Sequence, residues 1–149
     1  MNPGTNAGTD TAPTRAVVVE REMAHSPQKI WRALTEGKLI EEWLMSNDFE
    51  PVVGHRFTFR AAPVPGWSGV IESEVLVVEP PVKLAYSWGT LGVGTVVTWT
   101  LTPTASGTHL RMEQSGFGPD QEANYKGAKY GWNRFIGNLE RVVGGMDQS

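Results

Sequence analysis

The chain has 149 residues and a formal net charge of -3; 40% of the residues are hydrophobic and 19% are charged, a balance typical of one globular domain with a sizeable core. It contains no cysteine, which excludes disulfides, thiolate metal sites and cysteine nucleophiles. No basic run and no apolar run of roughly 18 residues occurs, so we expect neither a nucleic-acid partner nor membrane insertion.

Residues 1–14 are rich in Gly, Thr, Asn and Pro and have no apolar period, which predicts a disordered tail. A single domain is expected over residues 15–145. Since the N-terminus also lacks the basic and apolar regions of a signal peptide, we expect a cytoplasmic protein.

The first part of this domain combines one strand with two short helices. Arg15–Met23 alternates like a strand. Ser26 and Pro27 then suit the N-cap and the first position of a helix, and a second short helix is expected over residues 37–44. Both helices are too short to be stable unless they pack on a sheet.

The central part has a period of two, which predicts antiparallel strands with one solvated face. These strands are expected over residues 55–60, 68–78, 83–88, 95–102 and 108–115. In the second of them, one face carries Ile71, Ser73, Val75 and Val77, and the other carries Glu72, Glu74, Leu76 and Val78.

The last part, residues 119–143, has the three- and four-residue spacing of one long amphipathic helix. Pro119 and Asp120 suit its start, and the glycines at 144 and 145 suit its end. Glycines also interrupt its interior, although each costs up to about 1 kcal/mol relative to alanine. Gly127 and Gly131 either widen the space under the helix or permit close contact with the sheet.

This order of elements predicts an α+β fold in which a curved antiparallel sheet of about six strands wraps around the long C-terminal helix. The two short helices follow the first strand. The concave side of such a sheet leaves space beneath the helix, and large side chains of the inward strand faces point there: Phe57, Phe59, Tyr86, Trp88, Trp99 and Met112.

Several short motifs are spread over residues 15–143: Ser26-Pro27 with Ile30 to Thr35, Leu39, Trp43-Leu44, Pro51 to Phe57, Pro80-Pro81 with Leu84 to Trp88, Gly107 to Leu110, Ser115 to Phe117, and Gly131-Trp132 followed by Leu139. In their order and spacing these motifs resemble the START-like, pollen-allergen-like (SRPBCC) superfamily, and within it the homologues of the activator of the heat-shock-protein-90 ATPase. The resemblance implies the helix-grip fold.

The six tryptophans favour an internal cavity, because aromatic side chains beyond the needs of a core often line ligand sites. We therefore expect a non-enzymatic binding protein for a small apolar, aromatic or lipid-like ligand. The expected ligand-binding residues are Trp43, Phe57, Phe59, Ile71, Tyr86, Trp88, Trp99, Met112, Tyr125, Ala128, Trp132 and Phe135.

Two other functions stay open. The resemblance implies a protein-interaction module with a partner such as a chaperone, which requires an exposed apolar patch on the outer sheet face or on the short helices. A polyketide cyclase or aromatase instead requires an acid or base in the cavity. The candidates for that role are Glu74, Tyr86, Arg111 and Gln114.

No cofactor and no metal are expected. His25, His55 and His109 form no cluster and have no evident carboxylate partner in the sequence, so each is interpreted as a surface or edge residue. Glu72 and Glu74 share a strand face that we expect to point to water.

Overall fold

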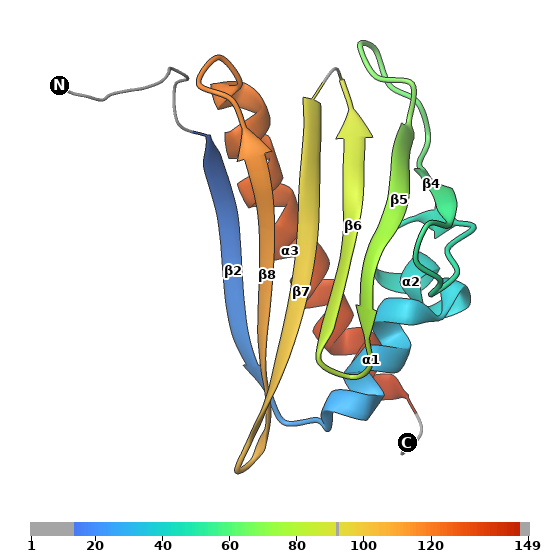
Figure 1. The fold of residues 1–149 in the computed structure, drawn as a ribbon, viewed down its shortest axis with the longest axis vertical. Helices are drawn as coiled ribbons and strands as arrows, with labels where there is room; N and C mark the ends of the chain where they lie inside the picture. The colour runs from blue at the N-terminus through green and yellow to red at the C-terminus, as the bar shows by residue number, and fades with distance from the viewer. Residues whose placement is uncertain (1–13, 92, 147–149) are drawn as a thin grey trace, which may run out of the picture.

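The structure, a computed structural model, describes residues 14–91 and 93–146, so the tail predicted over residues 1–14 lies outside the described residues except for Thr14. Within those ranges the chain forms one antiparallel sheet and three helices (Figure 1). In chain order the elements are β2 (Arg15–Met23), α1 (Pro27–Thr35), α2 (Gly37–Trp43), β3 (Ser46–Asn47), β4 (Arg56–Arg60), β5 (Val70–Glu79), β6 (Lys83–Thr90), β7 (Val93–Thr104), β8 (Gly107–Phe117) and α3 (Glu122–Gly145).

The strands lie in the order β2-β8-β7-β6-β5-β4-β3. Neighbours in the chain from β3 to β8 are therefore neighbours in the sheet, whereas β2 pairs with β8 at the far edge, where Val19 lies opposite Met112. This topology brings the start of the domain next to its last strand.

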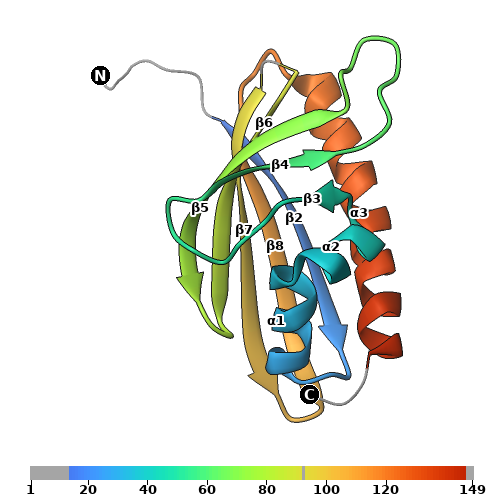
Figure 2. The ribbon, with the colours of Figure 1, turned by 90° about the vertical axis from the view of Figure 1, so that its right-hand side faces the viewer.

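The long helix α3 runs along the concave side of the curved sheet, and α1 and α2 cover the same side (Figure 2). Two ion pairs join α3 to β2, one between Arg15 and Glu122 and one between Arg21 Nη1 and Glu140 Oε1 at 3.1 Å. The α+β helix-grip prediction is confirmed.

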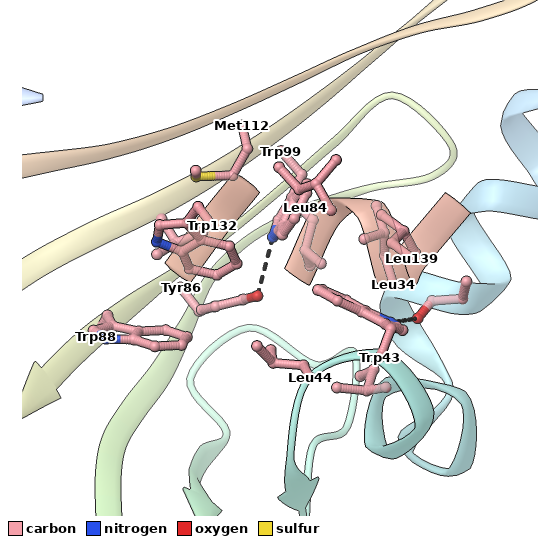
Figure 3. Packing of buried hydrophobic residues seen from close by; sticks show 14 of the residues in the cluster. Leu34, Trp43, Leu44, Leu84, Tyr86, Trp88, Trp99, Met112, Trp132 and Leu139 are labelled. Atoms are coloured by element: carbon pink, nitrogen blue, oxygen red, sulfur yellow. Dashed lines mark hydrogen bonds between the residues drawn. The ribbon is translucent and has the colours of Figure 1, made fainter. Parts of the chain in front are cut away.

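Aromatic side chains form the centre of the core between the sheet and the helices (Figure 3). The ring of Trp99 contacts Trp43 at a centroid distance of 5.6 Å and Trp132 at 5.7 Å. Trp132 in turn contacts Trp88 at 5.1 Å, and Trp88 contacts Phe59 at 5.2 Å. This unbroken series of rings joins α2, the sheet and α3.

The Trp43 side chain also makes a hydrogen bond that holds the short helices together. Its Nε1 donates to the carbonyl oxygen of Ala33 at 2.9 Å, joining α2 to α1. At the start of α1, the Ser26 hydroxyl accepts from Lys29 N at 3.2 Å, which confirms the predicted N-cap.

The ends of α3 differ from the prediction. Pro119 and Asp120 lie in a turn before the helix, which begins at Glu122 after its N-cap residue Gln121. At the other end, Gly144 and Gly145 lie inside the helix rather than after it. A proline and an acidic residue suit a turn as well as a first helical turn, so composition alone did not place the boundary.

The sheet also contains two features that alternation did not predict. The two-residue strand β3 pairs with β4 and gives the sheet a seventh strand among the described residues. A register shift in β5 between Val75 and Val77 turns Val78 toward the core, although the period of two had placed it on the face of Glu72.

Charged side chains of several strands lie on the outer face of the sheet. Glu72 is exposed and Glu74 lies 3.7 Å from Arg56, so both glutamates point away from the core as expected. Across β2 and β8, His109 Nε2 lies 2.7 Å from Glu20 Oε1, and His109 Nδ1 lies 2.5 Å from Glu22 Oε2. The expectation that this histidine has no carboxylate partner was therefore wrong, because the pairing of two strands distant in the chain supplies both.

No helix in the described ranges is long and apolar enough to cross a membrane.

Candidate functional site

A pocket of about 380 Å³ lies between the N-terminal half of α3 and one end of the sheet. The β4–β5 loop and the end of β6 lie at this same end of the molecule (Figure 2). The sheet and its loops line the pocket with Met45, Trp67, Ile71, Trp88, Thr90, Leu91, Val93, Gln114 and Phe117, and the segment 123–135 of α3 lines it with Ala123, Asn124, Gly127, Ala128, Gly131, Trp132 and Phe135.

The lining is apolar and uncharged. Among the described residues that line the pocket there is no Asp, Glu, Lys, Arg or His, and the polar side chains are those of Thr90, Gln114 and Asn124. Leu91, which is 57% exposed, lies at the rim, whereas Trp88, Gln114 and Trp132 are buried in the interior. The site thus extends from solvent into the aromatic core.

A hydrogen-bonded series runs from the pocket lining into the sheet. Trp132 Nε1 on α3 donates to Gln114 Oε1 at 2.6 Å, and Gln114 Nε2 donates to Thr95 Oγ1 on β7 at 2.8 Å. Thr95 Oγ1 then donates to the carbonyl oxygen of Trp88 on β6 at 3.0 Å. An amide nitrogen carries two hydrogens, so Gln114 retains one N–H beyond its bond to Thr95 within the described structure.

Trp67 connects the β4–β5 loop to the pocket. Its indole Nε1 donates to Thr90 Oγ1 at 2.7 Å, and Thr90 Oγ1 donates to the carbonyl oxygen of Val70 at 3.0 Å. These two bonds hold the loop beside the end of β6. Trp67 lies in a stretch without periodicity, so no sequence pattern predicted it as a site residue.

The structure brings five of the twelve predicted ligand-binding residues together in the lining: Ile71, Trp88, Ala128, Trp132 and Phe135. They come from β5, β6 and α3. The inward strand faces and the apolar stripe of the helix predict these five residues, but they predict residues outside the lining as well.

The other seven do not line this pocket: Trp43, Phe57, Phe59, Tyr86, Trp99, Met112 and Tyr125. All but the half-buried Tyr125 are buried in the core. Phe57, for example, packs edge-on against Phe59 and Tyr86, at centroid distances of 5.1 and 5.7 Å. Neighbouring rings, rather than open space, therefore surround Phe57.

Tyr86 is part of that packed centre. Its hydroxyl oxygen accepts a hydrogen bond from Trp99 Nε1 at 3.0 Å (Figure 3). Burial raises the pKa of the Tyr86 phenol well above its usual value, while the hydrogen bond from Trp99 acts in the opposite direction. The hydroxyl therefore remains protonated throughout the pH range in which proteins are usually studied.

The side chains considered as catalytic candidates lie in different places. Glu74 and Arg111 belong to the outer face, where Arg111 Nη1 lies 2.7 Å from Glu113 Oε1. Gln114 lines the pocket but has no ionisable group, and Tyr86 lies outside the lining. No group of three or more His, Cys, Asp or Glu side chains suited to a metal ion occurs in the described residues.

Two larger clefts are less suited to an apolar ligand. One of about 490 Å³ lies between the short helices and the C-terminal end of α3, and its lining includes Arg32, Glu42 and Arg141. The other, of about 560 Å³, lies between the β4–β5 loop and the adjoining ends of β6 and β7, and its lining includes Glu72 and three glycines. Both expose charged groups to solvent, so the uncharged pocket is the stronger candidate.

Comparisons with known proteins agree with this fold. A family model described as Activator of Hsp90 ATPase homolog 1-like protein matches residues 24–144. The crystal structure of protein MLL2253 from Mesorhizobium loti is 54% identical, with a TM-score of 0.84, and the match covers 89% of this chain and 99% of that one.

More distant structures are similar as well. DynU16, a putative protein in the dynemicin biosynthetic locus, is 26% identical with a TM-score of 0.75, and the match covers 89% of this chain but 48% of that one. Protein BH1534 from Bacillus halodurans shares the fold at 24% identity and a TM-score of 0.73, with 89% and 97% of the two chains covered. A search of curated proteins found no match.

Proposed function

The chain belongs to the family of Activator of Hsp90 ATPase homolog 1-like proteins, and on this premise we propose that it is a binding protein whose pocket under α3 takes a small, uncharged, apolar or aromatic molecule. The observation that carries the proposal is the uncharged lining of a space that reaches from solvent to the buried rings of Trp88 and Trp132. Fold alone would not support it, because one fold hosts many functions.

The size of the pocket suits such a ligand. Sites for small molecules typically enclose about 300–1,000 Å³ and are lined by hydrophobic and aromatic side chains with a few polar groups. The volume here is about 380 Å³. A charged ligand would lose its hydration without gaining an opposite charge from the lining, so a neutral molecule is favoured.

The polar groups of the lining limit the orientation of the ligand. Gln114, which is 3% exposed, has an amide N–H beyond those bonded to protein, and this group suits a carbonyl or hydroxyl oxygen on the ligand. The rings of Trp88, Trp132 and Phe135 provide the apolar surfaces around it. We therefore expect a ligand with a largely aromatic or aliphatic body and one oxygen acceptor.

The alternatives from the sequence have less support. An acid–base enzyme would need an ionisable side chain at the pocket, and the described lining offers none. The exposed large hydrophobic residues of the outer sheet face include Val18 on β2 and Leu76 on β5, and three strands separate these two. A chaperone partner stays a prediction from the resemblance.

The proposal is tested by tryptophan fluorescence and thermal unfolding against a panel of lipids, flavonoids and aromatic polyketides. Binding near Trp88 and Trp132 should change the emission in a saturable way. The same compound should raise the melting temperature, because a ligand that binds only the folded state stabilises it; at 100 times Kd the gain is about 2.7 kcal/mol.

A matched pair of variants then places the binding. Ala128→Phe inserts a ring into the lining, whereas Lys129→Phe places the same ring on the exposed side of α3. Loss of the response in the first variant and its retention in the second would support the pocket. Equal binding by both variants, or no binding by any member of a broad panel, would refute the proposal.

A further inference from the structure

Two glycines of α3, Gly127 and Gly131, belong to the lining of the pocket. They are four residues apart, so their α-carbons lie on the same face of the helix. Each lies inside a helix of 24 residues, where glycine costs up to about 1 kcal/mol relative to alanine. Some other feature of the structure must therefore explain them.

Backbone conformation does not require these glycines. The described glycines with positive φ include Gly66 and Gly69, whereas Gly127 and Gly131 have ordinary helical geometry. Alanine would adopt the same conformation and would favour the helix.

Close packing of the helix on the sheet does not require them either. A β-carbon built on Gly127 would have no heavy atom within 4 Å, and one built on Gly131 would meet only Phe135 Cε2 at 3.8 Å, an ordinary contact. At Gly107, by contrast, a β-carbon would overlap the carbonyl oxygen of Met23. Of the two explanations that the sequence left open, close contact with the sheet is therefore excluded, and open space remains.

We propose that Gly127 and Gly131 determine the size of the ligand, by leaving space along α3 that any other side chain would fill. This inference rests on the proposed function and specifies how broad the ligand is. Gln114 lines the pocket from β8 and the two glycines line it from α3, so a ligand that contacts Gln114 also lies along the bare helix backbone at Gly127 and Gly131. This arrangement suits a broad ligand, such as a molecule of several fused rings, rather than a slender one.

The experiment compares two neutral aromatic probes of different breadth, naphthol and hydroxypyrene. Each is titrated against the wild-type protein, the double variant Gly127→Ala/Gly131→Ala, the single variant Gly131→Leu, and the control Gly137→Ala. Gly137 lies on the same helix but outside the pocket lining, and its β-carbon would meet only Arg21 Nη1 at 3.9 Å.

The double variant should bind hydroxypyrene at least about 10-fold more weakly, because one methyl group too many in an apolar pocket is worth about 10–200-fold in discrimination. Its affinity for naphthol should change much less, and Gly131→Leu should widen the difference between the probes. The control should bind both probes as the wild type does. All alanine variants should melt at or above the wild-type temperature, which would show that the fold is intact.

The outcomes separate the two proposals. If the wild type binds the probes and the double variant binds both with unchanged affinity, or loses both equally, the size inference is refuted while ligand binding stands. If the wild type binds neither probe nor any compound of the wider panel, the proposed function is refuted, and the size inference falls with it.

Discussion

Replacing Gln114 by leucine tests whether buried hydrogen bonds hold α3 to the sheet. The side chain is 3% exposed, accepts from Trp132 Nε1 at 2.6 Å and donates to Thr95 Oγ1 at 2.8 Å. Leucine has a similar size but can do neither. Thr95 keeps its bond to the carbonyl oxygen of Trp88, so the group left without a partner is the indole N–H of Trp132.

The expected loss of stability comes from the unpaired indole N–H group of Trp132. A buried donor left unsatisfied costs about 1–3 kcal/mol, whereas the apolar leucine side chain regains part of this through burial. We expect Gln114→Leu to lower the free energy of unfolding by about 2 kcal/mol, mostly for this reason. For a chain of this size the corresponding fall in melting temperature is about 4–8 °C.

A double-mutant cycle measured by urea denaturation, with circular dichroism as the signal, isolates the bond. Trp132→Phe removes the donor, so Gln114→Leu should cost at least about 1 kcal/mol less in that background than in the wild type. A coupling energy below about 0.5 kcal/mol would refute the argument, as would a Gln114→Leu variant as stable as the wild type.

Two further predictions concern the outer face and the β4–β5 loop. Hydrogen bonds to Glu22 and Glu20 raise the pKa of His109, so its contribution to stability is complete below the unfolded pKa of about 6.5 and is lost as the pH rises through the higher folded value. His109→Gln should therefore lower the melting temperature at about pH 6, and the difference should vanish in alkaline buffer; a difference independent of pH would contradict this reading. Gly69 has a φ of +84°, and a β-carbon there would overlap the Ala61 carbonyl oxygen, so Gly69→Ala should cost about 2 kcal/mol or more in chemical denaturation. A decrease in the free energy of unfolding well below about 1 kcal/mol would contradict this prediction and show that the loop relaxes around the added methyl group.

Alternation and helical spacing predict which residues face inward wherever the register is regular, because the two periods are properties of the backbone; Val78, after the register shift in β5, is an exception. Phe57, Phe59 and Trp99 are all buried, as their strand faces indicated. Periodicity does not predict whether an inward-facing side chain lines a pocket or is enclosed in the core, since that depends on which other side chains pack next to it. For this reason the periodicity selected Trp88 and Phe59 alike, although only Trp88 lines the pocket.

The features that were missed depend on contacts between distant parts of the chain. The two carboxylates beside His109 come from β2, and their positions follow from the register of β2 against β8. Trp67 lies in the irregular β4–β5 loop, and its hydrogen bond to Thr90 at the end of β6 holds it at the pocket. Gln114 was considered only as a catalytic candidate, because its partners lie on another strand and on α3. None of these partners is close enough in sequence to produce a local pattern.

The pairing of β2 with β8 also has a consequence for synthesis on the ribosome. Strands β4 to β8 can pair with their predecessors as they emerge, but β2 is made first and its partner is the last strand of the sheet. Its apolar face, with Val17 and Val19, therefore has no strand beside it until β8 has left the exit tunnel. The helix that covers this face, α3, emerges later still. Such late, non-local pairing slows folding and prolongs the exposure of apolar surface. The nascent chain should therefore depend most on chaperones just before α3 emerges from the ribosome.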